Sequence, residues 1–192
     1  MNDRSTRESV DEEPAAGALL DAVEQIFANE SPSTVSMRTI AAEADCSLGL
    51  AYNYFASKDE LIGAALDRMA SRITANAAET AADDPRAALF ALLESMKSNA
   101  AFPRLLTWLV LEGRDVSGVM SGHPLMQRVA AVAAERGAAD PASTAMTMGL
   151  LAIGTFTYGA MLNRTLGRDP ADDRLLESAA DMYASWFPGP AA

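Results

Sequence analysis

The polar side chains between residues 36 and 58 are those in this sequence whose chemistry suggests a binding surface. They supply hydroxyl, amide, guanidinium and ammonium groups, which donate hydrogen bonds to phosphate oxygens and base edges. Within the same stretch, a glycine removes one side chain and so allows close approach to the backbone, while two leucines offer contacts to a thymine methyl. We expect a DNA-contact surface formed by Ser36, Arg38, Thr39, Ser47, Leu48, Gly49, Leu50, Tyr52, Asn53, Tyr54 and Lys58.

Two short helices joined by a tight turn would position these groups. Ser36 precedes a run whose apolar residues fall on one helical face, and Ser47 precedes a second short segment that extends to about Phe55. Serine is a favoured N-cap, because its side chain accepts a hydrogen bond from a free backbone N–H. The pattern predicts a helix-turn-helix at about 36–55, the unit whose second helix enters the major groove of DNA.

The flanking elements complete a small N-terminal head. Residues 1–13 are polar and aperiodic, which predicts a disordered tail. From Pro14 an amphipathic stripe runs to Phe27, and Ser57 caps a longer helix that leaves the head. We therefore expect a three-helix DNA-binding domain over 14–60.

Residues 61–192 continue in helical segments bounded by proline and glycine, with no convincing strand. Helices are expected over about 103–112, 124–136, 141–166 and 171–187, after one that opens at Asp84-Pro85. The fold class is all-α, with about nine helices: a helix-turn-helix head followed by a helical-bundle domain. At the end of one helix, Glu112 and Arg114 are expected to form a surface charge pair.

The charge of the chain favours a different interpretation. The net charge is −11, and residues 1–70 carry 13 acidic but only 5 basic side chains. Nucleic-acid-binding domains are usually basic. A helical interaction protein that has lost DNA binding is therefore the alternative, and a gel-shift assay would separate the two.

The remaining composition argues against catalysis, metal binding and membrane insertion. One cysteine, Cys46, and one histidine, His123, supply neither a nucleophile–base pair nor a metal cluster. We expect no enzyme activity, no catalytic residue, no cofactor and no metal. The apolar stretch 146–162 is too short and mixed to span a bilayer, and no signal stretch opens the chain. We expect a cytoplasmic protein without membrane contact.

The stretch around the two short helices resembles the tetracycline-repressor (TetR) family over residues 15–66. The matching features are Ile-Ala-Ala-Glu-Ala at 40–44, Ser-x-Gly at 47–49, Tyr-x-Tyr-Phe at 52–55 and Ser-Lys-Asp-Glu-Leu at 57–61. In such proteins, the residues that match Arg38, Leu48, Gly49, Tyr52, Asn53, Tyr54 and Lys58 commonly touch DNA. Where the family usually has Gly-Val in the turn, this chain has Asp45-Cys46, and Asp tolerates a left-handed backbone better than most residues.

The resemblance implies a ligand-responsive repressor that binds a palindromic operator as a homodimer. Family members hold an effector in the helical body, and their last two helices form the dimer interface. For this chain we expect a small, mainly hydrophobic effector at a pocket lined by Trp108, Leu111, Met126, Met146 and Phe156. The alternative is that these side chains only fill the core, as methionine does equally well. Similarly, either Tyr52 or Tyr54 is a core aromatic on the alternative interpretation, and Cys46 is a small buried hydrophobe rather than a redox sensor.

Overall fold

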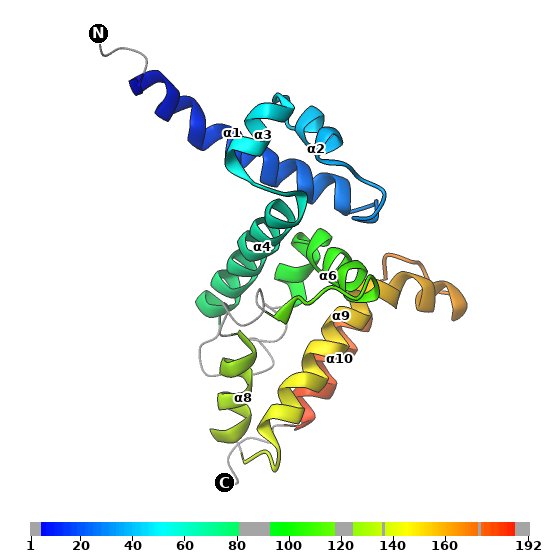
Figure 1. The fold of residues 1–192 in the computed structure, drawn as a ribbon. Helices are drawn as coiled ribbons and strands as arrows, with labels where there is room; N and C mark the ends of the chain where they lie inside the picture. Colours follow the sequence, from blue (N-terminus) through cyan, green and yellow to red (C-terminus); the bar gives the residue numbers. More distant parts are fainter. Residues whose placement is uncertain (1–4, 81–92, 118–124, 136, 173, 187–192) are drawn as a thin grey trace.

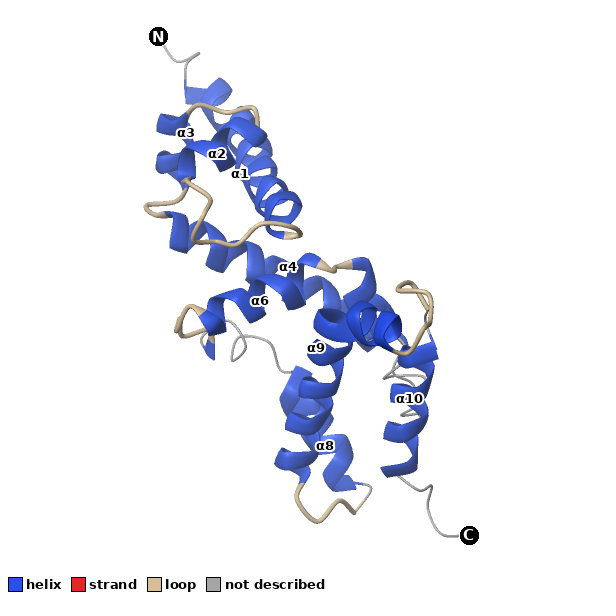
Figure 2. Ribbon diagram, turned by 90° about the vertical axis from the view of Figure 1, so that its right-hand side faces the viewer, coloured by secondary structure: helices blue, strands red, loops and turns tan. Residues whose placement is uncertain are grey.

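The computed structural model describes residues 5–80, 93–117, 125–135, 137–172 and 174–186, and within these residues the regular structure is entirely helical (Figures 1 and 2). The helices are α1 (Ser5–Phe27), α2 (Met37–Glu43), α3 (Leu48–Tyr54), α4 (Lys58–Thr80), α6 (Ala101–Leu111), α8 (Leu125–Glu135), α9 (Pro141–Thr165) and α10 (Arg174–Trp186). Residues 93–98 are helical as well. The expected all-α class is confirmed. Both views show an elongated molecule with α1–α3 at one end and α8 at the other.

Helix α1 begins earlier than the sequence pattern indicates. It starts at Ser5 and contains Pro14 in its interior, whereas we expected a disordered tail to residue 13; residues 1–4 lie outside the described part of the chain. Residues 5–13 have no apolar stripe to reveal a helix. Of their four acidic residues, Glu8 lies in the first turn, where negative charge is stabilised by the helix dipole. Pro14 removes one backbone hydrogen bond without ending the helix.

The head has its own apolar centre, to which α4 contributes. Leu19, Val23 and Phe27 of α1 are fully buried, as are Ile40 of α2 and Leu61 of α4. Helix α4 then continues without interruption past residue 60, where we expected the head to end, and carries buried Met69 into the body. The head and the body therefore share one continuous helix.

The body is assembled around α9. This helix packs against α6, α8 and α10, while α6 also touches α1 and α4. Two glycines of α9 accept side chains from its neighbours. A Cβ atom at Gly149 would lie 3.3 Å from Met126 of α8, and one at Gly159 would lie 3.1 Å from Leu175 of α10. These close approaches let α8 and α10 pack tightly on α9.

Candidate DNA-binding surface

The turn between α2 and α3 is a Schellman motif with aspartate at its left-handed position. The amide of Asp45 donates to Ala42 O (3.2 Å), and the amide of Cys46 donates to Ala41 O (2.9 Å). Both bonds satisfy carbonyls at the end of α2. Together they require a positive φ at the first of the two donor residues, which is Asp45. Asp45 has φ of 51°. The turn residue at which this chain departs from the family pattern thus adopts the backbone conformation that glycine adopts most easily.

The other helix ends of this type in the described chain use glycine. Gly113, Gly137 and Gly167 have φ values of 74°, 82° and 69°. At each glycine, its own amide and the amide of the next residue make the same two hydrogen bonds. At Gly113, for example, the second of these is Arg114 N to Leu109 O at 2.9 Å. Asp45 is therefore the one non-glycine residue with positive φ among the described residues, and it lies in the turn that precedes α3.

Helix α3 presents one face to solvent and buries the other. Ala51 is fully buried, and Leu48 and Tyr54 pack against the core. Gly49, Tyr52 and Asn53 are exposed. These three follow the i, i+3, i+4 spacing of a single helical stripe, and half-buried Leu50 lies beside it. Of the two tyrosines, Tyr54 thus has the core position and Tyr52, 49% exposed, the solvent position.

Gly49 has no structural role inside the protein. A Cβ atom there would come no closer than 4.0 Å to another group, the Ser47 Oγ atom, and its φ is not positive. Glycine in a helix costs about 0.5–1 kcal/mol relative to alanine. The same openness occurs at Gly17, Gly63 and Gly154; on α3 it leaves the backbone accessible to close approach by a ligand.

Serines cap both helices, as expected. Ser36 accepts a hydrogen bond from the Thr39 amide (3.2 Å) and shares a second with the Thr39 hydroxyl (2.9 Å). Ser47 accepts from the Leu50 amide at 3.1 Å. Arg38, in the first turn of α2, is exposed. Of the residues expected at the DNA-contact surface, the exposed ones in this region are Ser36, Arg38, Thr39, Ser47, Gly49, Tyr52 and Asn53.

Lys58, expected to contact a DNA phosphate, makes hydrogen bonds within the protein. Its ammonium donates to Pro32 O (2.7 Å) and to Val35 O (2.9 Å) and is partly buried. It thereby ties the loop before α2 to the start of α4. Of the three N–H donors of an ammonium, these bonds leave one for an external acceptor. The structural function of Lys58 was missed because the carbonyls lie 23 and 26 residues away.

Polar links between the head and the body were also not predictable from spacing. Glu112, at the end of α6, accepts hydrogen bonds from the Ser31 hydroxyl (3.0 Å) and the Ser33 amide (3.1 Å) in the loop after α1. Arg114 pairs with Asp59 of α4 at 2.8 Å. The expected pairing of Glu112 with Arg114 is therefore wrong: each binds a partner in the head instead.

A second polar cluster joins α1 to α4. Arg68 binds Asp21 and Glu24, each at 2.6 Å, and Arg72 binds Glu24 at 2.5 Å. Arg72 also donates to the Asn99 side chain (3.2 Å), just before α6. Acidic residues of the head are thus neutralised by cations of α4, a pairing across more than 40 residues that composition cannot reveal.

The five residues expected to line a ligand pocket are not brought together. Trp108 and Phe156 are half-buried against the core, and Met126 packs on Gly149. Leu111 and Met146 are exposed, with 76% and 64% of their surface accessible. Leu111 is the last residue of α6. Met146 belongs to α9, which is apolar on all sides, so the sequence of α9 does not show which side of that helix faces inwards.

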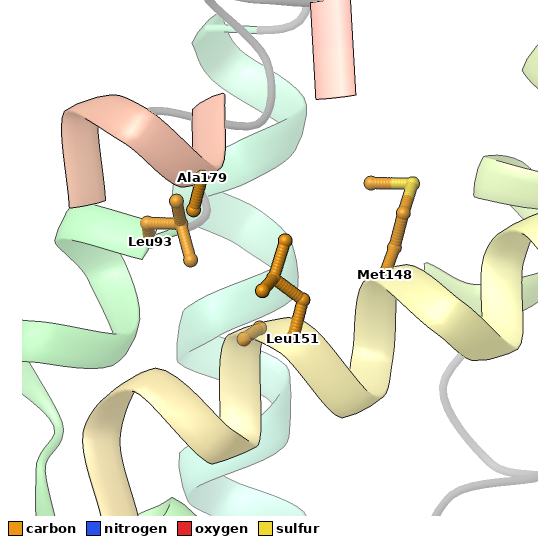
Figure 3. Close-up of a pocket in the computed structure, with 5 residues that line it drawn as sticks. Leu93, Met148, Leu151 and Ala179 are labelled. Carbon is orange, nitrogen blue, oxygen red and sulfur yellow. The ribbon is translucent and has the colours of Figure 1, made fainter. Parts of the chain in front are cut away.

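The structure has a small apolar pocket elsewhere in the body. Leu93, Met148, Leu151, Ala152 and Ala179 line it, and it encloses about 180 Å³, counting space open to solvent. In Figure 3 the labelled side chains from residue 93, α9 and α10 converge on this space. Its lining contains no polar side chain. Among the described residues, no cluster of three potential metal ligands occurs.

Comparison with known proteins gives a consistent result. Residues 19–65 match the family model for bacterial regulatory proteins of the tetR family. The HTH-type transcriptional repressor Rv3405c of Mycobacterium tuberculosis is 39% identical over 62 residues, 32% of this chain, and the match spans only a third (33%) of that relative's length.

Two further relatives are similar along most of the chain. The uncharacterized HTH-type transcriptional regulator Rv1255c of Mycobacterium tuberculosis is 29% identical over 171 residues, 85% of this chain and 82% of that protein. The crystal structure of a transcriptional regulator from Rhodococcus sp. Rha1 superposes with a TM-score of 0.71 at 19% identity. That superposition covers 90% of this chain and 95% of the other. The fold is therefore shared beyond the head.

Proposed function

The chain belongs to the tetR family of bacterial regulatory proteins, and from this premise we propose that it is a cytoplasmic, dimeric transcriptional repressor released from DNA by a small hydrophobic effector. One observation carries the DNA-binding part. The exposed stripe of α3 consists of Gly49, Tyr52 and Asn53, and no group of the protein obstructs a close external approach at Gly49.

The test is direct titration of DNA. Labelled duplexes tiled across the DNA upstream of the protein's own gene are titrated with the full chain, and fluorescence anisotropy reports binding. We expect one duplex to bind at least a thousandfold more tightly than the others, the lower end of specific recognition. Uniform weak binding of all duplexes would instead favour the alternative suggested by the net charge of −11, a helical interaction protein without DNA binding.

The dimer interface is proposed on α9. Along this helix, Met146, Leu150, Tyr158 and Leu162 are exposed apolar side chains at successive i+4 positions, with Gly154 in the middle. Such a row is a ridge that packs into the groove of a facing helix, and it extends about 24 Å at 1.5 Å per residue. A Cβ atom at Gly154 would meet nothing within 4 Å, so a second copy can approach closely there.

Helix α9 also has the length and hydropathy to cross a membrane, which among the described helices is true of α9 alone. The packing of its other sides favours a dimer instead. Met126 and Leu175 occupy Gly149 and Gly159 on the sides that face α8 and α10. A second copy covers the remaining apolar row, and a palindromic operator needs two heads about 34–36 Å apart.

Sedimentation tests this assignment. The wild-type chain is expected to sediment as a dimer at micromolar concentration, and Leu150→Glu as a monomer, because a charge would be buried without a partner. Leu111→Glu is the matched control, since Leu111 is equally exposed but belongs to α6. A wild-type monomer, or a dimer that survives Leu150→Glu and Tyr158→Glu together, would contradict the interface.

The effector is proposed to enter between residue 93, α9 and α10. The described side chains that line the pocket are all apolar, and the space between them does not admit a water-sized group, so a ligand must move these helices apart. Helix α6 contacts α9 on one side and α1 and α4 on the other, and Glu112 links it to Ser31 and Ser33. Displacement in the body is thus transmitted to the head.

Calorimetry measures the coupling. A small molecule identified by mass spectrometry of the purified protein is titrated into the dimer with and without operator DNA. A hundredfold loss of operator affinity corresponds to about 2.7 kcal/mol of coupling, which is reciprocal. We expect Glu112→Gln to reduce this factor and Glu135→Gln, an exposed residue at the end of α8, to leave it unchanged. Equal ligand affinities in both titrations would exclude the switch for that molecule.

A further inference from the structure

The exposed stripe of α3 carries no charged side chain, and this restricts the bases that it can read. The helix reads Leu-Gly-Leu-Ala-Tyr-Asn-Tyr from 48 to 54. Recognition of guanine through its O6 and N7 atoms is the usual function of arginine or lysine. Arg38 lies on α2, and Lys58 directs two of its donors to Pro32 O and Val35 O. Guanine readout from α3 therefore lacks its usual bidentate donor.

Asn53 has the chemistry that adenine requires. It is exposed, and its carboxamide offers a donor and an acceptor together, which match the N7 acceptor and N6 donor of adenine in the major groove. Ser36, Thr39 and Ser47 already use their hydroxyls within the caps. On the exposed face of α3, Asn53 offers its donor and its acceptor on two separate atoms of one planar group, whereas Tyr52 has a single hydroxyl.

Leu50 is placed to contact the neighbouring base pair. It lies three residues before Asn53 on the same side of the helix, where side chains are about 5–6 Å apart at Cβ. That separation suits adjacent base pairs, which rise 3.4 Å along each strand. Its methyl groups fit against the C5 methyl of thymine. Gly49, beside it, lets the backbone come close enough for both contacts.

We propose that α3 reads A·T base pairs, with Asn53 bonding adenine and Leu50 contacting the thymine methyl of the adjacent pair. This inference rests on the proposed function and goes further, because it assigns the class of base and the two residues that discriminate it. Arg38 remains for a phosphate or for a guanine outside the pairs covered by α3.

Selection from a randomised duplex library with the full-length protein tests the assignment, followed by affinity measurements on the enriched site. We expect two adjacent A·T pairs per half-site, and loss of the adenine preference in Asn53→Ala. Asn29→Ala is the matched control, because Asn29 is exposed at the end of α1. Circular dichroism confirms that the variants are folded.

A second measurement changes only the DNA. Replacing the thymine by uracil removes the methyl group, and wild-type affinity should fall about fourfold, the effect of exposing one methyl group. The same replacement should leave Leu50→Ala unchanged. Enriched sites with G·C at the positions that depend on Asn53, or equal affinity for thymine and uracil, overturn the base assignment alone. Failure to enrich any sequence overturns the proposed DNA-binding function and the assignment with it.

Discussion

Replacing Asp45 by glycine should stabilise the protein, although it removes a polar side chain from the turn of the helix-turn-helix. Asp45 holds φ of 51° because the Cys46 amide must reach Ala41 O and its own amide must reach Ala42 O. Both bonds are backbone bonds and survive the substitution. Gly113, Gly137 and Gly167 already show that the same motif forms with glycine in this chain.

The magnitude follows from two opposing terms. A left-handed backbone costs an L-residue roughly 1–2 kcal/mol, and aspartate less, since it is enriched there. Against this gain, glycine increases the entropy of the unfolded chain, which costs about 0.4–1 kcal/mol. The balance predicts that Asp45→Gly adds up to about 0.5–1 kcal/mol, and that Asp45→Ala, without the polar side chain that tolerates this conformation, loses a similar amount. For a chain of this size, 1 kcal/mol corresponds to about 2–4 °C in Tm.

Urea unfolding followed by circular dichroism measures the three proteins on one scale. Gly113→Ala is the matched control, because it places alanine at φ of 74° with nothing within 4 Å of its Cβ atom. After the gain from the unfolded chain is subtracted, it should be destabilised by up to about 1.5 kcal/mol. The reasoning fails if Asp45→Gly is less stable than the wild type or if Asp45→Ala is more stable.

Three further outcomes are expected. Gly49→Ala should gain about 0.5–1 kcal/mol in stability yet bind operator DNA more weakly in the anisotropy assay. Gly17 is equally unobstructed, and Gly17→Ala should gain stability without a change in DNA affinity. Unchanged DNA affinity in Gly49→Ala would contradict the close approach of DNA to α3. Lys58→Met should lower the free energy of unfolding in urea by about 1–2 kcal/mol, because two hydrogen bonds are lost. Arg38 is exposed, and Arg38→Met should lower it by less than about 0.5 kcal/mol. Equal losses in the two variants would contradict the structural function of Lys58. Burial and, secondly, the charge of Asp45 raise the pKa of the Cys46 thiol. As the pH rises, the thiol therefore loses its proton in the unfolded chain before it does so in the folded protein. Stability should therefore fall above about pH 8.5 relative to Cys46→Ala, and parallel pH profiles would speak against it.

The helix-turn-helix was predictable because its signals are local. Ser36 and Ser47 cap the helices that they precede, and the apolar residues of α2 share one face at helical spacing. Each of these features acts within four residues along the chain. The start of α1 at Ser5 was not predictable in the same way, because residues 5–13 have no apolar stripe and periodicity detects only helices that bury one face.

The body was predictable in class but not in the orientation of its helices. Helix α9 is apolar on the side that packs in the protein and on the row proposed for a second copy. Periodicity therefore cannot show that Met148 faces inwards while Met146 is exposed. The bonds of Glu112 connect residues 79 and 81 positions apart. Contacts of that range depend on how α6 lies across α1 and α4, which no spacing rule contains.

Part of the acidic charge that argues against DNA binding is paired within the protein. Asp21 and Glu24 are neutralised by Arg68 and Arg72, and Asp59 is paired with Arg114. The stripe of α3 itself is uncharged. Release of counterions by lysine and arginine gives most DNA-binding proteins their salt dependence, about 0.9 in log–log slope for each phosphate neutralised. An uncharged recognition helix leaves most of the affinity to base contacts and shape, which salt screens least.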